Sequence, residues 1–491
     1  MDCRVKPGND ARWWAGLEPY DGGALGDRQG VTDDSAESSP RWTGITARTL
    51  SRQAAAAAEM LSDAGAAPGR PVAVVTTSAA AIAILAHTAP LLPVPLFPID
   101  PSLPDNVIAD LLDQAGVDLV VADRPFAGRT HIATADVLSA PAGAEVPWRA
   151  PDGIALLIAT SGSSGRPKAV MLTGAALAAA AKASEAATPL GPGDVWLASL
   201  PLFHIGGFSI LTRSALAGAT ALIHERFDAE RVMESLKAGG VTHLSLVPAM
   251  LSRLCDREAS PATLKHVLVG GAALSVDLAE RAAGLGWPIQ PTYGMSEAAS
   301  QIATLASLPR PWRAGHVGPP LPGAEVALAD DGRMKVRGGM LMAGYANPGL
   351  APGDGLEDGW FVTADLAEIG PDGITVLGRA DDVIVSAGKK VLPAMVEGLV
   401  SACPGIETVA VAGRPDAIWG EVVVAIYRGT ALPEDVLSWC RENVASALRP
   451  RAALKVAAFP ELANGKPDRS ALKRLAASDD VETEAGTCGK D

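Results

Sequence analysis

The sequence predicts an α/β fold: a large N-terminal domain of parallel-rich sheets with a small β subdomain, plus a small mobile α+β C-terminal domain. Three observations lead to this prediction. Short buried strands alternate with helices from about residue 45, and segments become short and β-rich after about residue 320. After Arg379 the pattern becomes that of a small unit with both helices and strands. Strands that alternate with helices indicate parallel sheets covered on both faces. A chain of 491 residues is long enough for two or three domains.

Local composition places the expected elements. The run Ala54–Leu61 is strongly helix-forming, and Gly65 and Gly69 end it. In chain order we expect buried strands at 72–76, 92–96, 119–122, 155–159, 195–200, 220–223, 244–247 and 266–269, and helices from 79, at 106–115 and at 175–187. Hairpin strands are expected at 324–328, 334–337 and 374–377.

The same texture divides the chain into four parts. Residues 1–40 are rich in Gly, Asp and Ser without a sustained period, so we expect a disordered tail there. We expect the large domain at 41–378, the mobile cap domain at 379–475, and a frayed polar tail at 476–491.

Charge and composition exclude several classes of protein. Lys and Arg number 41 and Asp and Glu 55, which gives a net charge of −14 and argues against broad capture of nucleic acid or anionic membrane. Hydrophobic residues make up 48% of the chain, enough for a large core. The five cysteines are far apart, so neither a disulfide framework nor a cysteine zinc site is expected. A local basic pocket for a nucleotide remains compatible with these numbers.

No targeting segment is expected. The first 20 residues carry charges throughout and lack an apolar core, which argues against a signal peptide. The uncharged run Pro71–Ile99 is interrupted by four prolines between Pro90 and Pro98, which favours buried helix and strand over a membrane span. We therefore expect a soluble cytoplasmic protein.

A loop of small residues carries the first chemical signal. The strand expected at 155–159 runs into Thr160-Ser-Gly-Ser-Ser-Gly-Arg-Pro-Lys168. Backbone N–H groups of such a loop can converge on a phosphate, while its hydroxyls add donors and its lysine adds charge. It is not a Walker A loop, because Pro167 precedes Lys168 where that motif needs a glycine. The alternative is a surface turn, against which the spacing of its threonine, glycines and lysine argues.

This loop resembles the phosphate loop of the adenylate-forming (AMP-binding) superfamily, which includes acyl-CoA synthetases, carrier-loading adenylation domains and firefly luciferase. The resemblance covers about residues 45–475, and six further segments similar to the superfamily's motifs follow in its order. They are Pro201–Gly207, Gly270–Leu274, Tyr293–Glu297, Trp360–Asp365, Gly378–Asp382 and Asn464–Lys466. Seven motifs in the same order make a chance resemblance negligible.

The resemblance implies an ATP-dependent acid–CoA ligase that uses ATP, Mg²⁺ and CoA. A carboxylate would attack the α-phosphate and release pyrophosphate, and a thiol would then attack the acyl-adenylate and release AMP. The first step needs Mg²⁺ and cations placed in advance. The second needs an intermediate that is shielded from water.

Catalytic roles fall by the same resemblance on Lys466, Glu297, Lys168 and His204. Glu297 is the expected Mg²⁺ ligand, helped by the Thr160 hydroxyl. Lys466 would contact the α-phosphate and the substrate carboxylate from the tip of an Asn-Gly turn. Taken singly, such lysines are usually solvated and such glutamates usually lie on the surface, so both assignments depend on the motifs around them.

The nucleotide would be held by a larger set. Tyr293 would stack on adenine, although core packing is the alternative, and Asp365 and Arg379 would bind the ribose. The expected nucleotide-binding residues are Thr160, Ser161, Gly162, Ser163, Ser164, Gly165, Lys168, Gly271, Ala272, Ala273, Thr292, Tyr293, Gly294, Met295, Ser296, Asp365 and Arg379. The chain departs from the family at Ala364, where the family usually has glycine, and this departure bears on the geometry of the nucleotide.

Two further groups complete the predicted site. Asp381 is the expected hinge between the half-reactions, with a surface ion pair as the alternative, and Ser386, Gly388 and Lys389 would face the CoA channel, unless that segment is a plain β-turn. The acid would lie beside His204, Arg213 and Ser300.

Arg213 follows an apolar stretch, Ile205–Leu211, where a buried cation needs a partner. A second carboxylate on the substrate would be that partner, whereas a protein acid or solvent is the alternative. Within the superfamily, Leu200–Gly207, Leu244–Pro248, Val269–Leu274 and Tyr293–Gln301 are most similar to the o-succinylbenzoate–CoA ligases.

The substrate is therefore expected to be o-succinylbenzoate or another carboxylic acid, fatty or aryl, with no nucleic-acid partner and no integral membrane segment. A stand-alone enzyme that loads a carrier-protein thiol is the alternative function. A nucleotide-binding regulator without catalysis is a second, against which Lys466, Glu297 and Asp365 argue, and a luciferase-like oxygenase is a third. The oligomeric state does not follow from the sequence.

Overall fold

The computed structural model describes residues 47–88, 91–140, 153–160, 166–446, 448–461, 467–478 and 482–483. The tail expected at 1–40 lies outside these residues. So do Ser161–Gly165 of the expected phosphate loop and Lys466.

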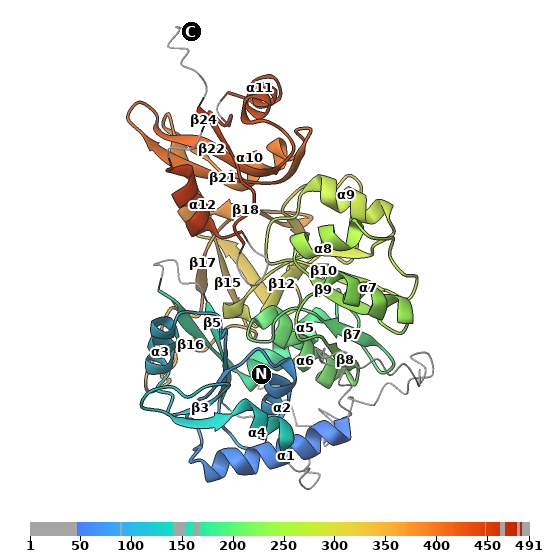
Figure 1. The fold of residues 1–491 in the computed structure, drawn as a ribbon, viewed down its shortest axis with the longest axis vertical. Coiled ribbons are helices and arrows are strands. Elements are labelled where there is room, and N and C mark those ends of the chain that lie inside the picture. The colour runs from blue at the N-terminus through green and yellow to red at the C-terminus, as the bar shows by residue number, and fades with distance from the viewer. Residues whose placement is uncertain are drawn as a thin grey trace, which may run out of the picture.

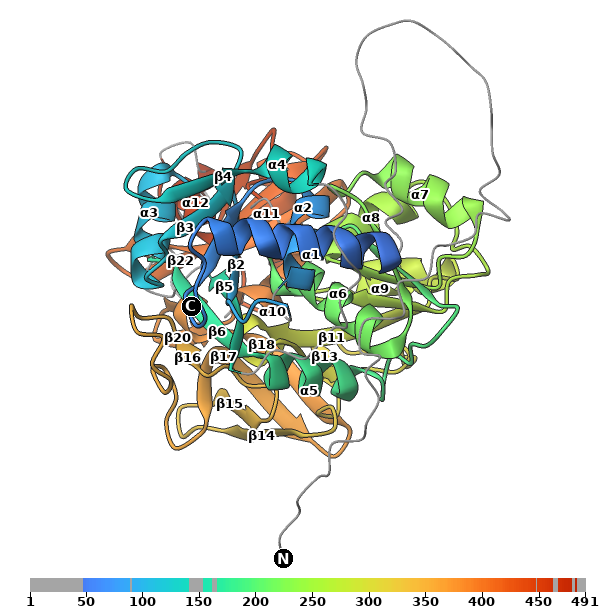
Figure 2. The same cartoon turned by 90° about the horizontal axis from the view of Figure 1, so that it is seen from below.

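The first sheet forms the base of the large domain and is mostly parallel. Its strands run in the order β16-β6-β5-β2-β1-β3-β4. The strands are β1 (Val72–Val75), β2 (Leu96–Ile99), β3 (Leu119–Ala122), β4 (Thr130–Ala133), β5 (Ile154–Thr160), β6 (Lys168–Thr173) and β16 (Gly344–Tyr345). Only β6 runs antiparallel to its neighbours, β5 and β16. The associated helices are α1 (Ala47–Asp63), α2 (Ala79–Thr88), α3 (Asp105–Gln114) and α4 (Thr134–Ser139), and α1 crosses the base beside α2 and α4 (Figure 2).

The second sheet has the order β12-β11-β10-β9-β7-β8 and is parallel except for β12. Its strands are β7 (Val195–Ala198), β8 (Thr220–Ile223), β9 (His243–Leu246), β10 (His266–Val269), β11 (Ile289–Met295) and β12 (Ser300–Thr304). The helices of this part are α5 (Gly174–Ser184), α6 (Ile205–Ala217), α7 (Ala229–Ala238), α8 (Pro248–Cys255) and α9 (Val276–Gly284). The carboxyl ends of β7, β10 and β11 lead directly into the predicted motifs, as open parallel sheets favour for ligand sites.

An antiparallel sheet forms the predicted β subdomain. Its order is β13-β18-β17-β15-β14. The strands are β13 (His316–Gly318), β14 (Ala324–Leu328), β15 (Arg333–Gly338), β17 (Phe361–Gly370) and β18 (Gly373–Arg379). One hydrophobic cluster contains Leu156 of the first sheet, Ile302 of the second and Met334 of the third, so these parts share a core.

The small C-terminal domain lies above the body and meets it near β18 (Figure 1). Its strands are β19 (Ile384–Ser386), β20 (Lys389–Val391), β21 (Ile406–Asp416), β22 (Gly420–Gly429), β23 (Ala452–Lys455) and β24 (Glu482–Thr483). Its helices are α10 (Pro393–Val400), α11 (Pro433–Asn443) and α12 (Arg469–Ala476). It has hydrophobic clusters of its own around Val411 and Val424. The fold class predicted from sequence is confirmed.

The structure differs from the sequence prediction at two places. The strand expected at 92–96 lies instead at Leu96–Ile99. Pro93 and Pro95 lack the N–H groups that a central strand needs, and this segment turns so that Val94 N–H donates to the Leu92 carbonyl. Part of the tail expected at 476–491 is β24, which pairs with Ala452 and Ala453 of β23.

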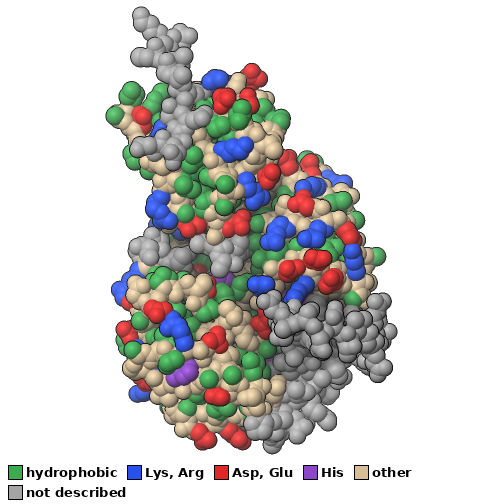
Figure 3. Space-filling model, viewed as in Figure 1, with side chains coloured by type: hydrophobic (Ala, Val, Ile, Leu, Met, Phe, Trp, Pro, Cys, Tyr) green, Lys and Arg blue, Asp and Glu red, His purple; other side chains and the backbone are tan. Residues whose placement is uncertain are grey.

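Charged side chains of both signs occur on the surface seen in Figure 3. On the face seen in Figure 3, acidic and basic side chains of the described residues are interspersed. None of the described helices combines the length and apolar composition that a bilayer crossing requires.

Three buried histidines make stability depend on pH. Burial lowers the pKa of His87, His224 and His243 from 6.5 to about 4. Between pH 6.5 and 4 the unfolded chain binds protons at these histidines that the folded protein does not. The free energy of unfolding therefore keeps its full value from these groups above pH 6.5 and falls as the pH drops toward 4.

We therefore expect the free energy of unfolding to decline over this window, by up to about 1.4 kcal/mol per pH unit for each histidine. Replacing His243 by Gln, which keeps a donor for the Pro189 carbonyl, should make the decline shallower by one such contribution. Urea unfolding followed by tryptophan fluorescence at several pH values measures it. Parallel curves for the two proteins would contradict this account.

Candidate active site

Glu297 lies where β11 ends, in the short 3-10 helix Ser296–Ala298. The Tyr345 hydroxyl donates a hydrogen bond to Glu297 Oε1 at 3.0 Å. The Met342 N–H donates to the Glu297 backbone carbonyl at 2.8 Å. Burial raises the pKa of the Glu297 carboxyl, although the hydrogen bond from Tyr345 acts in the opposite direction. One segment of the chain thus contacts both the carboxylate and the backbone of Glu297.

The two ends of the phosphate loop lie opposite each other. Thr160 ends β5 and Lys168 begins β6, and the two residues pair across the strands. The Thr160 hydroxyl donates to the Lys168 carbonyl at 3.3 Å. The Lys168 ammonium lies 4.5 Å from the centre of the Tyr345 ring. The strands therefore hold the residues at both ends of the loop, while Ser161, Gly162, Ser163, Ser164 and Gly165 lie outside the described residues.

The backbone after β10 and at the end of β11 approaches its neighbours closely. A Cβ on Gly270 would lie 2.7 Å from Thr292 Cγ2, and one on Gly294 would lie 1.8 Å from the Ser300 carbonyl oxygen. Gly271 has a φ of 78° and turns the chain into Ala272 and Ala273. Only glycine fits this geometry without displacing backbone.

The predicted ribose ligand Asp365 is already part of a hydrogen-bonded group. The Tyr293 hydroxyl donates to Asp365 Oδ2 at 2.5 Å, and Arg379 Nη1 lies 4.0 Å from Asp365 Oδ1. Burial and the charge of Asp365 raise the pKa of Tyr293, so the phenol stays a donor. These residues come from β11, β17 and the end of β18, where Asp365 pairs with Arg379.

Other predicted nucleotide residues lie on β11 or directly after it. The Thr292 hydroxyl donates to the Ala303 carbonyl and bonds to Thr304, so this side chain ties β11 to β12. Met295 and Ser296 directly precede Glu297 in the chain. Ala364 is not among the described residues with left-handed φ, so the change from the family glycine introduces no strain of that kind.

The predicted acid pocket lies between α6 and β12. Arg213 is only 5% exposed, and its Nη2 donates to the Ser300 hydroxyl at 2.9 Å. Its guanidinium carbon lies 5.3 Å from the centre of the Trp196 ring. Ser300 has a φ of 117°, in the region that disfavours residues other than glycine.

Arg213 has no carboxylate within ion-pair distance among the described residues, and its Nε has no hydrogen-bond partner there. Burial lowers the pKa of its guanidinium from 12.5 to about 9. Within the described part of the chain, the Arg213 guanidinium therefore has neither a protein carboxylate nor open contact with solvent, which were the two alternatives to a substrate carboxylate. A buried cation of this kind is suited to an anionic ligand.

His204 caps the N-terminus of α6, the helix that also carries Arg213. Its ring lies edge-on to Phe203 at a centroid distance of 4.9 Å. A Cβ on Gly207 would lie 2.4 Å from the Pro201 carbonyl oxygen, so the first turn of α6 packs tightly on the segment before it.

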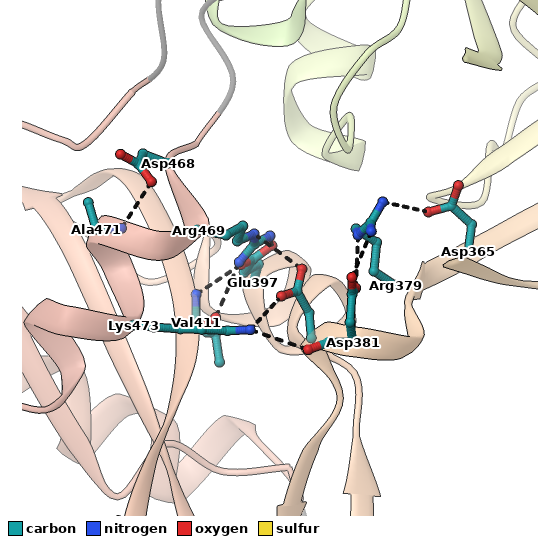
Figure 4. Close-up of polar contacts among 10 residues, drawn as sticks. Asp365, Arg379, Asp381, Glu397, Val411, Asp468, Arg469, Ala471 and Lys473 are labelled. Carbon is teal, nitrogen blue, oxygen red and sulfur yellow. Dashed lines mark hydrogen bonds and ion pairs between the residues drawn. The ribbon is translucent and has the colours of Figure 1, made fainter. Parts of the chain in front are cut away.

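The predicted hinge residue Asp381 forms a two-point contact with Arg379 (Figure 4). The nitrogen–oxygen distances are 2.9 and 2.7 Å. Burial acts to raise the pKa of Asp381, but the hydrogen bond and charge of Arg379 outweigh it and lower that pKa. The ion pair that was the alternative interpretation is thus present, and its Arg379 also lies 4.0 Å from Asp365, the predicted ribose ligand.

The next residue, Asp382, contacts the small domain instead. Lys473 Nζ lies 2.9 Å from Asp382 Oδ1 and donates to the Asp381 carbonyl at 3.2 Å. Arg469 Nε lies 4.0 Å from Asp382 Oδ2, while its terminal nitrogens bond Glu397 at 2.6 and 3.1 Å. Both cations belong to α12, so the carboxylate of Asp382 and the carbonyl of Asp381 are bound by the same helix, whereas the Asp381 carboxylate is bound by Arg379.

The predicted CoA-channel segment is a two-residue hairpin turn. Ser386 and Lys389 pair at the ends of β19 and β20, and the turn residues Ala387 and Gly388 have φ of 49° and 75°. A Cβ on Gly388 would meet no atom within 4 Å. The segment is therefore a β-turn, as in the alternative interpretation, and it also leaves open space beside Gly388.

Sequence analysis did not identify Tyr345, Asp382, Glu397, Arg469 or Lys473. Asp382 stood within a recognised motif, and Arg469 follows Lys466 closely, so position offered a weak signal for these two. Tyr345 carried none, because it reaches Glu297 and Lys168 only through the pairing of β16 with β6.

Comparisons with known proteins agree with this geometry. A family described as AMP-binding enzyme matches residues 26–347, and the AMP-binding enzyme C-terminal domain matches residues 395–466. The 2-succinylbenzoate–CoA ligase of Bacillus licheniformis is 37% identical over 334 residues, covering 65% of this chain and 70% of that protein.

Two solved structures of one similar protein differ in their TM-score against this chain. O-succinylbenzoate coenzyme A synthetase (MenE) from Bacillus subtilis, in complex with ATP and magnesium ion, has a TM-score of 0.79 at 28% identity, covering 87% of this chain and 94% of that one. A double mutant of that synthetase bound to its product analogue OSB-NCoA has a TM-score of 0.65 at 28% identity, covering 87% and 93%. From the family match and the site, the chain belongs to the AMP-binding enzyme family.

Proposed function

We propose that the protein is an ATP-dependent, AMP-forming acid–CoA ligase that makes an acyl-adenylate and then an acyl-CoA thioester. The observation that carries the proposal is the convergence of Glu297 and Lys168 on Tyr345, at the end of the phosphate-loop hairpin. The family match and the named ligases support the same activity.

The donor chemistry of the site fits Mg²⁺ and ATP. Glu297 and Thr160 offer hard oxygen donors, which Mg²⁺ prefers, and the bound ion supplies positive charge to the phosphates. Asp365, positioned by Tyr293, accepts the ribose hydroxyls. Lys168 places a cation at the phosphate loop, and Lys466, which lies outside the described residues, supplies a second at the α-phosphate.

Arg213 supports a dicarboxylic acid such as o-succinylbenzoate as the substrate. A buried guanidinium without a protein acid among the described residues is costly in the ligand-free protein. A second carboxylate, bound at two points with the Ser300 hydroxyl alongside, would offset that cost. We propose that His204, the N-cap residue of the same helix, separates the acid from the nucleotide.

We further propose that the small domain, from about residue 379, turns at Asp381 between the half-reactions. Asp381 is bound through its side chain to Arg379, the last residue of β18, whereas Asp382 is bound to α12. The turn would bring Ser386, Gly388 and Lys389 toward the thiol. The TM-score is lower for the product-analogue complex than for the ATP complex of the similar synthetase, which supports a second position of the small domain.

The activity is tested by pyrophosphate release with ATP, Mg²⁺ and a panel of acids, with CoA or with a phosphopantetheinylated carrier protein. We expect release that depends on o-succinylbenzoate and a thioester that forms with CoA. Lys466→Ala should slow release at least about 100-fold, because a cation at the transferring phosphate is lost. Release with no acid, or thioester only on the carrier protein, would contradict the ligase proposal.

Substitution of Arg213 tests the substrate. Arg213→Met should lower kcat/KM for o-succinylbenzoate about 100-fold or more, because a buried charge pair with the ligand is lost. Activity on 4-oxo-4-phenylbutanoate, which lacks the second carboxylate, should change little. The ligand-free variant should unfold at the same or a higher temperature, because an unpaired buried charge is removed. An equal loss on both acids would contradict the assignment.

Substitution of Lys473 tests the hinge. The Lys473 side chain is 51% exposed, so its ion pair is worth about 0.2–1 kcal/mol. Lys473→Met should therefore speed limited tryptic cleavage after Arg379 by about 1.4- to 5-fold, because the hinge opens more often. Arg474→Met, an exposed cation on the same helix, is the matched control. Equal cleavage of both variants would show that Lys473 does not restrain the hinge.

A further inference from the structure

We propose that Tyr345 is a positioning residue for the adenylation step: its hydroxyl orients the Glu297 carboxylate, and its ring holds the Lys168 ammonium beside that carboxylate. The inference rests on the proposed function, which places Mg²⁺ at Glu297 and phosphate at Lys168. It adds a residue that no motif of the sequence identified.

One side chain contacts both charged groups. The Tyr345 hydroxyl lies 3.0 Å from Glu297 Oε1, and the Lys168 ammonium lies 4.5 Å from the centre of the ring. These two groups come from different sheets, since Lys168 opens β6 and Glu297 follows β11. Tyr345 is therefore the contact through which their positions become dependent on each other.

The backbone of Tyr345 is fixed by hydrogen-bonded neighbours, and its ring packs against a glycine. Tyr345 pairs with Val170, and its N–H donates to the Asp354 carbonyl at 3.0 Å. A Cβ on Gly355 would lie 2.5 Å from Tyr345 Cε2, so the ring packs directly against the backbone of that glycine, whose φ of 84° also favours glycine. The phenol has little freedom to leave Glu297.

The phenol hydroxyl faces the carboxylate as a hydrogen-bond donor, 3.0 Å from Glu297 Oε1. A donor that fixes the plane of a metal-binding carboxylate reduces the freedom that the carboxylate loses on binding. Loss of such an outer partner typically lowers metal affinity about 10- to 100-fold.

The contact with Lys168 is of a second kind. Lysine is a flexible cation with several rotatable bonds, and Lys168 is exposed in the ligand-free protein. The face of an aromatic ring attracts an ammonium group and restricts where it lies. Removal of the hydroxyl alone leaves this contact in place, whereas removal of the ring abolishes both.

Three full-length variants separate these effects. Tyr345→Phe removes only the hydroxyl, and Tyr345→Leu also removes the aromatic face. Tyr427→Phe is the matched control, because Tyr427 is fully buried in the small domain and its hydroxyl donates to the Ala431 carbonyl at 3.0 Å.

The first readout is binding of Mn²⁺ to each protein in complex with α,β-methylene-ATP, which cannot release pyrophosphate. The free Mn²⁺ signal in electron paramagnetic resonance measures it. The second readout is calorimetric binding of AMP without metal. Pyrophosphate release by the wild-type protein with o-succinylbenzoate is measured in parallel.

We expect Tyr345→Phe to weaken Mn²⁺ binding about 10-fold or more while AMP binding stays within twofold of wild type. Tyr345→Leu should in addition weaken binding of α,β-methylene-ATP itself, and Tyr427→Phe should match wild type in every readout. Unchanged Mn²⁺ binding by Tyr345→Phe would overturn the proposal, as would an equal loss of Mn²⁺ and AMP binding, which a general packing defect would produce.

The same data separate this inference from the proposed function. If wild type releases pyrophosphate but Tyr345→Phe binds Mn²⁺ normally, the ligase stands and the role of Tyr345 is wrong. If the selective loss of Mn²⁺ binding is seen while wild type releases no pyrophosphate with any acid, Tyr345 keeps its role and the ligase activity is wrong. Absence of Mn²⁺ binding by wild type would overturn the inference.

Discussion

Backbone hydrogen bonds of residues 342–346 join the two large sheets at the point where the site forms. Met342 N–H donates to the Glu297 carbonyl, while Ala343 and Ala346 N–H donate to carbonyls of Met171 and Ala169 in β6. Glu297 follows a strand of the second sheet, and β6 belongs to the first. This segment therefore sets the separation of a carboxylate and a lysine that no single sheet could position. Lys168 opens β6, the strand whose carbonyls accept two of these bonds.

Burial acts in opposite directions on the two charged groups that the proposed ligands would meet. It raises the pKa of Glu297 and lowers that of Arg213, because in each case the charged form loses hydration. Both groups are therefore less favourable in the ligand-free protein than they would be at the surface. A cation at Glu297 and an anion at Arg213 remove that penalty, so the desolvation that costs stability also favours ligands of the matching charge.

The sequence was sufficient for the parts of the site that are local in the chain. Glu297 and Tyr293 are identified because the contiguous segment Tyr293–Glu297 resembles a superfamily motif, and the alternation of strands and helices predicts the fold class. The missed contacts are non-local. Tyr345 reaches Glu297 across 48 residues, through a strand of only two residues that has no periodicity to detect. The strand predicted at 92–96 is wrong for a local reason. Its apolar residues favour a strand, but Pro93 and Pro95 lack the N–H groups that a central strand needs.

A chain of ionic contacts connects the nucleotide residues to the helix that follows the Lys466 loop. Arg379 lies between Asp365 and Asp381, and the carbonyl of Asp381 accepts a hydrogen bond from Lys473 of α12 (Figure 4). The pair of Arg469 with Glu397 fixes the start of the same helix on α10. Lys473 and Arg469 both belong to α12, so their contacts with Asp381, Asp382 and Glu397 hold this helix against α10 and the segment after β18. The position of α12, and with it that of the small domain relative to Arg379, therefore depends on a few ionic side chains at the hinge.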